Sequence, residues 1–268
     1  MTGRVWELLA VPLRSARRAG LAWGISLAIL VGLTVAFWPS FRDQPELADL
    51  IDAMPEGLVE AFGLADFNSP EGFLRGNLYA VLVPLLMAVA GVLLMNGQTA
   101  ADEDAGRMEP YLAQPVTRGG VFLGRVIAVG AWLVVIGLLM LVTQLASDAV
   151  VDLEISTARI VDTVVLCLLL GALHAGLAAL VAGATGRPGL VLAVGLAVGV
   201  GGYVVSALFP LSDILEPWRH VSPWDWALGG DPLTNQAEWW RYAALAGPAL
   251  ALVAMGAWAF TRRDVSAA

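Results

Sequence analysis

Six stretches of this chain lack any charged residue over 20 or more positions, and together they take up more than half of its 268 residues. A helix rises ~1.5 Å per residue and the hydrocarbon core of a bilayer is ~30 Å thick, so about 20 apolar residues cross it. Each stretch is therefore long enough to span a membrane. We predict an all-α integral membrane protein with a single transmembrane domain over residues 1–268, whose spans lie at about 19–39, 76–98, 122–146, 163–184, 188–210 and 242–261.

The basic residues narrow the chemistry that the chain can perform, because all fifteen are arginine and none is lysine. A P-loop needs a lysine on the nucleotide phosphates, so the chain is not by itself a P-loop ATPase, and Schiff-base catalysis through lysine is excluded. One cysteine and two histidines supply neither a disulfide framework nor a zinc-type ligand cluster. We therefore predict a non-catalytic protein that itself holds no cofactor and no metal, and whose surroundings are lipid rather than nucleic acid.

The distribution of arginine predicts the side of the membrane that each loop faces. With an even number of spans both termini lie on one side, and ten arginines fall on that side against five on the other. By the positive-inside rule the termini and the loop 99–119 are cytoplasmic, whereas the loops 40–75 and 211–241 face outward. Residues Gly3–Arg18 combine leucines with four arginines, which is typical of a helix lying at the lipid headgroups before the first span.

The loop between the second and third spans is the only cytoplasmic segment long enough to hold an element of its own. Apolar residues recur there at helical spacing across 101–112, acids occupy the first turn, and Pro115 ends the run. The apolar positions are Ala101, Ala105, Met108 and Leu112. Arg107 follows Glu103 by four residues and Asp104 by three, so either acid is spaced to pair with it. The pattern predicts a short amphipathic helix.

The stretch from Ala101 to Arg118, which reads ADEDAGRMEPYLAQPVTR, resembles the cytoplasmic loop of ABC transporter permease subunits of the ABC-2 type, the type-2 ABC exporters. In that family an acidic run, a glycine, a glutamate, a leucine-rich turn and a Pro-Val-Ser/Thr-Arg ending recur in this order. The segments Met54–Gly63, Ser222–Trp226 and Phe260–Val265 are also similar to the family. With the six spans, the resemblance covers essentially the whole chain.

This resemblance implies that the loop is a coupling helix, which docks into a separate nucleotide-binding subunit and carries ATP-driven motion to the spans. It also implies that the partner ATPase holds ATP and Mg, that a second permease chain, identical or closely related, completes the transporter, and that the complex lies in the plasma (inner) membrane of a bacterium or archaeon. By position, the residues that would contact or orient against the ATPase are Glu103, Asp104, Arg107, Glu109 and Arg118. The alternative is that these charges only cap the helix and keep the loop in water.

Two further candidate sites lie inside the spans. His174 is, apart from Cys167, the only ionisable side chain well inside a span, so it is a candidate for the transport pathway, although a neutral histidine can also do no more than bond a neighbouring helix. Gly195 and Gly199 have the spacing that lets helices approach closely, and the resemblance places the fifth span at the contact between two permease chains. Pro84 predicts a kink in the second span.

The spans carry no Asp, Glu, Lys or Arg well inside them, which disfavours a pathway for ions or sugars. A route lined by apolar side chains suits a hydrophobic or amphipathic cargo, such as a lipid-like molecule, an antibiotic or another drug. We therefore predict the permease subunit of an ATP-driven exporter. Two alternatives are an ATP-independent transporter or scaffold, and an intramembrane serine protease, which is disfavoured because the Gly-x-Ser-Gly setting of its nucleophile is absent.

Overall fold

The computed structural model describes residues 2–42, 50, 53–61, 66, 69–108 and 116–263. Within these ranges every regular element is a helix, and six of the helical segments are long and apolar enough to cross a membrane. They are α2 (Arg17–Phe41), the segment Pro70–Asp104, α9 (Arg118–Val151), α10 (Thr157–Thr185), the segment Pro188–Leu211 and α13 (Trp239–Arg262). The predicted all-α fold with six spans is confirmed.

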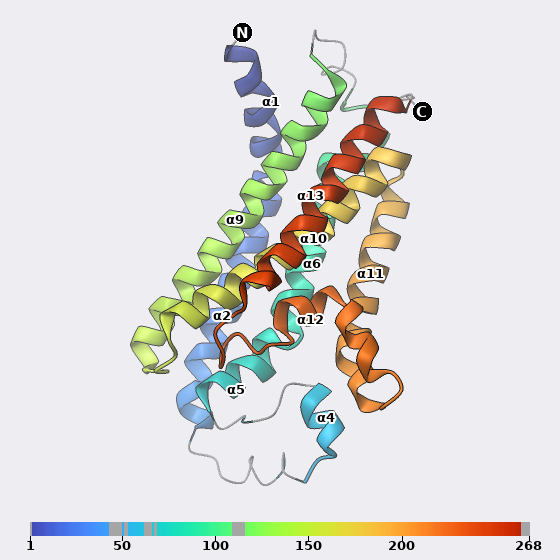
Figure 1. The fold of residues 1–268 in the computed structure, drawn as a ribbon. Helices are drawn as coiled ribbons and strands as arrows, with labels where there is room; N and C mark the ends of the chain where they lie inside the picture. Colours follow the sequence, from blue (N-terminus) through green and yellow to red (C-terminus); the bar gives the residue numbers. More distant parts are fainter. Residues whose placement is uncertain are drawn as a thin grey trace.

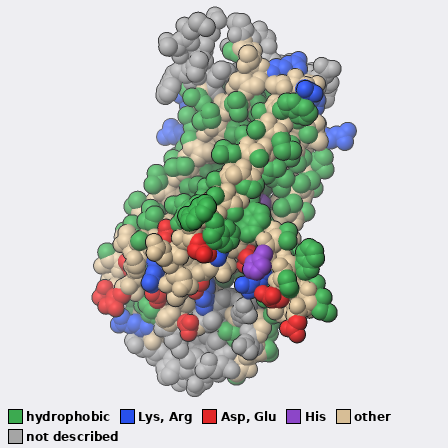
Figure 2. All heavy atoms as spheres, in the orientation of Figure 1, with side chains coloured by type: hydrophobic (Ala, Val, Ile, Leu, Met, Phe, Trp, Pro, Cys, Tyr) green, Lys and Arg blue, Asp and Glu red, His purple; other side chains and the backbone are tan. Residues whose placement is uncertain are grey.

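The two ends of the helical bundle hold different parts of the chain. Both chain termini lie at one end, here called the terminal end, whereas α4 (Glu56–Ala61), α5 (Pro70–Leu74) and α12 (Pro223–Leu228) lie at the other, the loop end (Figure 1). Figure 2 shows hydrophobic side chains over the middle of one face and acidic side chains gathered toward the loop end. Along α2, Ile25 and Phe37 are both more than half exposed. An apolar exterior of this kind needs a lipid environment.

The first span is preceded by a helix that continues into it almost without a break. Only Ala16 separates α1 (Thr2–Ser15) from α2, and the Ala16 N–H donates to the Pro12 carbonyl at 3.0 Å. α1 packs along α9, where Trp132 Nε1 donates to the Leu13 carbonyl at 3.0 Å. A helix is therefore present before the first span and its C-terminal part lies against α9, whereas its position at the lipid headgroups stays a prediction.

The second span is built from several pieces. α5 leads into a π-helical turn, η1 (Arg75–Tyr79), and after a turn at positions 80 and 81 the chain continues as α6 (Leu82–Gln98). Because Pro84 has no N–H, it cannot bond the carbonyl four residues earlier, at Ala80. The interruption falls at that position, as the kink predicted at Pro84 requires.

α10 is the central helix, and it contacts α6, α9, α11 (Pro188–Leu208) and α13. Two of these contacts bring backbones together. A Cβ added at Gly91 of α6 would lie 2.2 Å from the Gly171 carbonyl oxygen of α10, and one added at Gly183 of α10 would lie 2.2 Å from the Gly256 carbonyl oxygen of α13. Only glycine permits such close approach, so these positions fix the distance between the helices.

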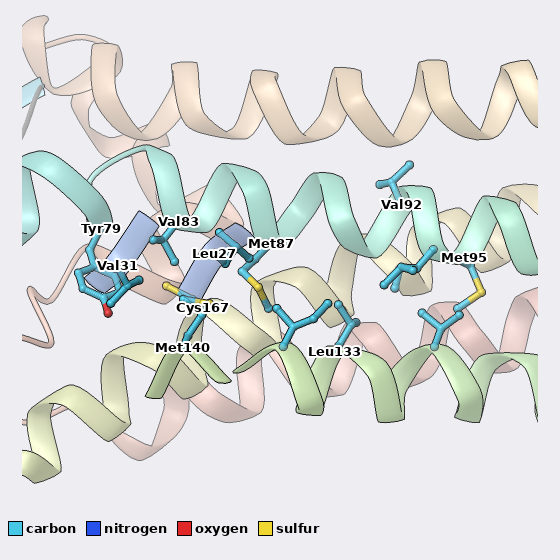
Figure 3. Packing of buried hydrophobic residues seen from close by; sticks show 14 of the residues in the cluster. Leu27, Val31, Tyr79, Val83, Met87, Val92, Met95, Leu133, Met140 and Cys167 are labelled. Atoms are coloured by element: carbon cyan, nitrogen blue, oxygen red, sulfur yellow. The ribbon is translucent and has the colours of Figure 1, made fainter. Parts of the chain in front are cut away.

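The main hydrophobic core lies between α2, α6, α9 and α10. Figure 3 shows side chains from these helices converging, among them Leu27 and Val31 of α2, Met87 of α6, and Leu133 and Met140 of α9. All five are at most 1 % exposed. This core holds the first four spans together, so a displacement of one of them is felt by the others.

Candidate coupling site at the terminal end

The loop after the second span begins with a short helix that a glycine stops. This helix, α7 (Ala100–Asp104), is followed by Gly106 in the left-handed region at φ +70°. The Gly106 N–H donates to the Glu103 carbonyl at 2.9 Å, and the Arg107 N–H donates to the Asp102 carbonyl at 2.9 Å. These two bonds form the Schellman arrangement that closes a helix.

The amphipathic helix predicted across 101–112 therefore ends at Asp104 in the described part of the loop. The helical spacing of apolar residues continues past Asp104 in the sequence. The left-handed conformation of Gly106 nevertheless interrupts the helical backbone, so the apolar pattern alone does not determine where the helix ends. Glu109 and Leu112 lie outside the described residues, so the role predicted for Glu109 stays a prediction.

Glu103 is buried, and its partner is not the one that the spacing predicted. Arg263, just after α13, donates from Nη2 to Glu103 Oε2 at 2.6 Å. The pairing of Arg107 with Glu103 or Asp104 is wrong, because Arg107 Nε instead donates to Asp102 Oδ1 at 2.8 Å. Since α7 ends at Asp104, Arg107 no longer lies one helical turn further along the same face.

Arg263 joins three helix ends to α7. Its Nε donates to the Gly183 carbonyl of α10 at 3.3 Å, and its own carbonyl accepts a hydrogen bond from Arg118 Nη1, at the start of α9, at 3.0 Å. The turn after α10 leaves room for the guanidinium, because a Cβ at Gly186 would lie 2.5 Å from Arg263 Nη1. The ends of α9, α10 and α13 are thus connected to the loop through one side chain.

A second arginine makes the corresponding connection to α6 and α1. Arg125 is 3 % exposed, and its Nη1 donates to the Gln98 carbonyl and to Asp102 Oδ2. Ser15 Oγ of α1 donates to Gln98 Oε1 at 3.1 Å. We call the connected set the terminal network, and it consists of Ser15, Gln98, Asp102, Glu103, Arg118, Arg125 and Arg263.

Sequence reasoning missed the roles of Arg125 and Arg263 in this network. Both were counted only as positive charges that orient the chain. The one available signal was the Asp-Glu-Asp run at 102–104, whose acids need partners if they are buried.

The predicted coupling residues that the structure describes fall into two groups. Asp104, Arg107 and Arg118 are exposed, whereas Glu103 is buried. We call Asp104 and Arg107 the exposed edge of the loop. This edge adjoins the terminal network, because Arg107 bonds Asp102 and Asp104 follows Glu103 in the chain. Across the described residues, no three His, Cys, Asp or Glu side chains lie close enough together to hold a metal ion.

The candidate residues inside the spans meet at the contact of α11 with α6 and α10. His174 is buried, and because a carbonyl can only accept, its Nδ1 donates to the Leu170 carbonyl at 2.8 Å. Its Nε2 has no hydrogen-bond partner in the described part of the chain. A Cβ at Gly199 would lie 3.5 Å from this Nε2, and one at Gly195 would lie 2.7 Å from the Val92 side chain of α6. Both glycines therefore face helices of the same chain.

A comparison with protein families shows which family the chain matches. The family described as the multidrug efflux system permease Rv1217c, C-terminal domain, matches residues 7–261. The matched region holds the six spans apart from the last residue of α13, and all of the terminal network except Arg263. No individual curated protein matches the chain.

Proposed function

Because the chain belongs to the family of the multidrug efflux system permease Rv1217c, C-terminal domain, we propose that this multi-pass membrane protein is the permease subunit of an ATP-driven exporter of the ABC-2 type. A separate ATPase subunit binds ATP and Mg and hydrolyses the ATP, and the permease contributes no catalytic residue. The cargo is a hydrophobic or amphipathic compound, such as a drug, an antibiotic or a lipid-like molecule, which moves outward.

The observation that carries this proposal is the terminal network beneath an exposed loop. The ATPase docks on the exposed edge formed by Asp104 and Arg107, and its movement displaces α7. The Glu103–Arg263 pair passes the displacement to α13 and α10, and the Asp102–Arg125 pair passes it to α9. Because the Glu103–Arg263 contact alone stabilises this arrangement by about 1–2 kcal/mol, α7 moves together with the helix ends rather than apart from them.

The buried polar side chains support an apolar cargo. Within the six charge-free stretches, those that the structure describes are uncharged in type, and they include Gln144 and Thr163 besides His174. An ion would find no acid or arginine there to replace its hydration shell. We assign His174, with its unpartnered Nε2, as the polar group of the pathway that cargo passes.

A second permease chain, identical or closely related, completes the transporter in the plasma membrane of a bacterium or archaeon. From the resemblance we expect it against the first and fifth spans, and the exposure of Leu33 of α2 and Val200 of α11, each more than half exposed, supports this position. We assign Gly195 and Gly199 to packing within one chain, because they face α6 and α10. The arginine excess at the terminal end supports cytoplasmic termini.

Co-purification tests the partner and the docking surface together. The tagged chain is isolated in mild detergent as wild type, as the exposed-edge variant Asp104→Arg/Arg107→Glu, and as the control Glu216→Arg, a half-exposed acid at the loop end. We expect an ATPase with the wild type and the control, and none with the exposed-edge variant. Recovery with all three would overturn the docking surface alone. An intact wild type without an ATPase would overturn the pump and favour the ATP-independent alternative.

A further inference from the structure

A cavity of about 140 Å³ lies at the loop end, far from the terminal network. Its walls come from η1, α10, α11 and α12 and from the turn that follows α12, and they include Tyr79, Tyr203, Ser206, Trp224 and Leu233. Most of these side chains are aromatic or aliphatic. The cavity therefore offers an apolar enclosure with a few polar groups, the usual character of a small-molecule site.

Three hydrogen-bonding groups of the cavity walls have no partner among the residues that the structure describes. Trp224 is 2 % exposed, yet its Nε1 makes no hydrogen bond in the described part of the chain. Tyr203 and Ser206 lie one turn apart on α11, and neither hydroxyl is bonded to any described group, whereas the Tyr79 hydroxyl already donates to Gln144 at 3.3 Å. An indole N–H can only donate, so it needs an acceptor, and an unsatisfied buried donor is costly.

The charges at the cavity cancel each other. Arg75 Nη1 lies 2.6 Å from Asp231 Oδ2, and both residues belong to the lining. Asp231 Oδ2 also accepts a hydrogen bond from Thr234. Among the described lining residues Asp231 is the one acid and Arg75 the one arginine, and their pairing offsets the two charges. A neutral ligand is therefore favoured over an anion or a cation.

The size and the walls suit one aromatic ring. A cavity of about 150 Å³ is enough to hold benzene. The rings of Tyr203 and Trp224 lie 5.3 Å apart at 57°, and tilted aromatic walls of this kind accept a further ring against an edge or a face.

We propose that this cavity binds an uncharged aromatic ring that carries a hydrogen-bond acceptor, such as a carbonyl oxygen. The ring fills the apolar space, and the acceptor takes hydrogen bonds from Trp224 Nε1 and from the hydroxyls of Tyr203 and Ser206. The inference rests on the proposed function in one respect, which is that the ligand is cargo held at the loop end before release. It names the cargo class as neutral aromatic compounds with acceptor oxygens.

Protection from labelling tests the site directly. Cys167 is the sole cysteine, so a Cys167→Ala/Ala207→Cys chain carries one thiol, in the lining of the cavity. Its reaction with a maleimide in mild detergent is timed with acetophenone or with ethylbenzene, which has a similar shape but no acceptor. We expect acetophenone to slow labelling at concentrations at which ethylbenzene does not. Equal protection by the two compounds, or none by either, would overturn the proposal.

Variants of the donors sharpen the test. Tyr203→Phe and Trp224→Phe keep an aromatic ring but remove a donor, and each should raise the half-protecting acetophenone concentration roughly three- to tenfold. Trp218→Phe, an exposed tryptophan outside the lining, is the control and should change nothing. Size-exclusion chromatography verifies folding, and Ser206→Ala replaces any variant that aggregates. Unchanged concentrations in the folded donor variants would contradict the assignment.

The labelling reaction contains neither an ATPase nor ATP, so its result is independent of the pump. Protection in a chain that co-purifies with no ATPase would leave the site standing and refute ATP-driven export of its ligand. Loss of protection in a chain that does bind an ATPase would refute the site and leave the pump intact.

Discussion

Because Glu103 contacts Arg263, we expect a measurable coupling energy between these two side chains. The pairing of Glu103 with Arg107, which sequence spacing favoured, predicts no such coupling. Glu103 Oε2 lies 2.6 Å from Arg263 Nη2, and the two side chains are 7 % and 22 % exposed. Hydrogen bonds to charged groups contribute roughly 1.5–3 kcal/mol. Because solvent partly reaches the Arg263 side chain, we expect a coupling energy of about 1–2 kcal/mol.

A double-mutant cycle measures this quantity. Glu103→Gln, Arg263→Gln and the double variant are unfolded with sodium dodecyl sulfate in mixed micelles, and the free energy of unfolding is followed by circular dichroism. The matched cycle replaces Arg263→Gln by Arg107→Gln and should give a coupling energy below about 0.5 kcal/mol, because Arg107 bonds Asp102. Coupling with Arg107 and none with Arg263 would refute the structural arrangement, since it would mean that the helix continues past Asp104.

Three further substitutions or labels test how the spans pack. Gly183→Ala should destabilise the fold by about 1–3 kcal/mol and lower the melting temperature, because the new Cβ would lie 2.2 Å from a carbonyl oxygen of α13. Gly247→Ala should have little effect, because no neighbouring atom lies within 4 Å of its new Cβ. Equal effects of the two variants would contradict the backbone contact at Gly183. Trp132→Phe removes the hydrogen bond to the Leu13 carbonyl, worth about 1 kcal/mol, and should speed proteolysis within α1; an unchanged cleavage rate would show that other contacts hold α1. Cys167 is fully buried, so a maleimide should modify it only after denaturation, and modification of the folded chain would contradict the packing of α10.

The spans could be predicted from charge-free runs because the bilayer leaves the backbone few alternatives to a helix. The ends of the spans could not be predicted in this way. The third span was expected at 122–146, but α9 runs from Arg118 to Val151. The reason is that α9 extends past its apolar stretch at both ends: the Thr117 hydroxyl accepts a hydrogen bond from the Gly120 N–H and caps its start, and Asp152, in the left-handed region, ends it. A charge-free run marks only the apolar part of such a helix.

The coupling role of the loop after the second span stays a prediction, and the contacts of this loop could not be predicted from the sequence. The hydrogen bonds of Arg125 to Gln98 and of Arg263 to Glu103 join residues 27 and 160 positions apart. Spacing along one helix carries no information on such pairs. Gly106 was the local signal that was overlooked, since a glycine after an acidic turn is typical of a helix end.

Transport into inside-out membrane vesicles tests the central claim, that an ATPase drives this permease through the terminal network. Vesicles from cells that express the chain with its co-purifying ATPase are mixed with tritiated colchicine, an uncharged amphipathic drug with an aromatic ring and carbonyl oxygens, and its uptake is followed by rapid filtration. We predict uptake that requires hydrolysable ATP, persists when the proton gradient is collapsed, and is lost in Arg263→Gln although the ATPase remains bound. Uptake that needs no ATP and stops with the proton gradient would contradict the account.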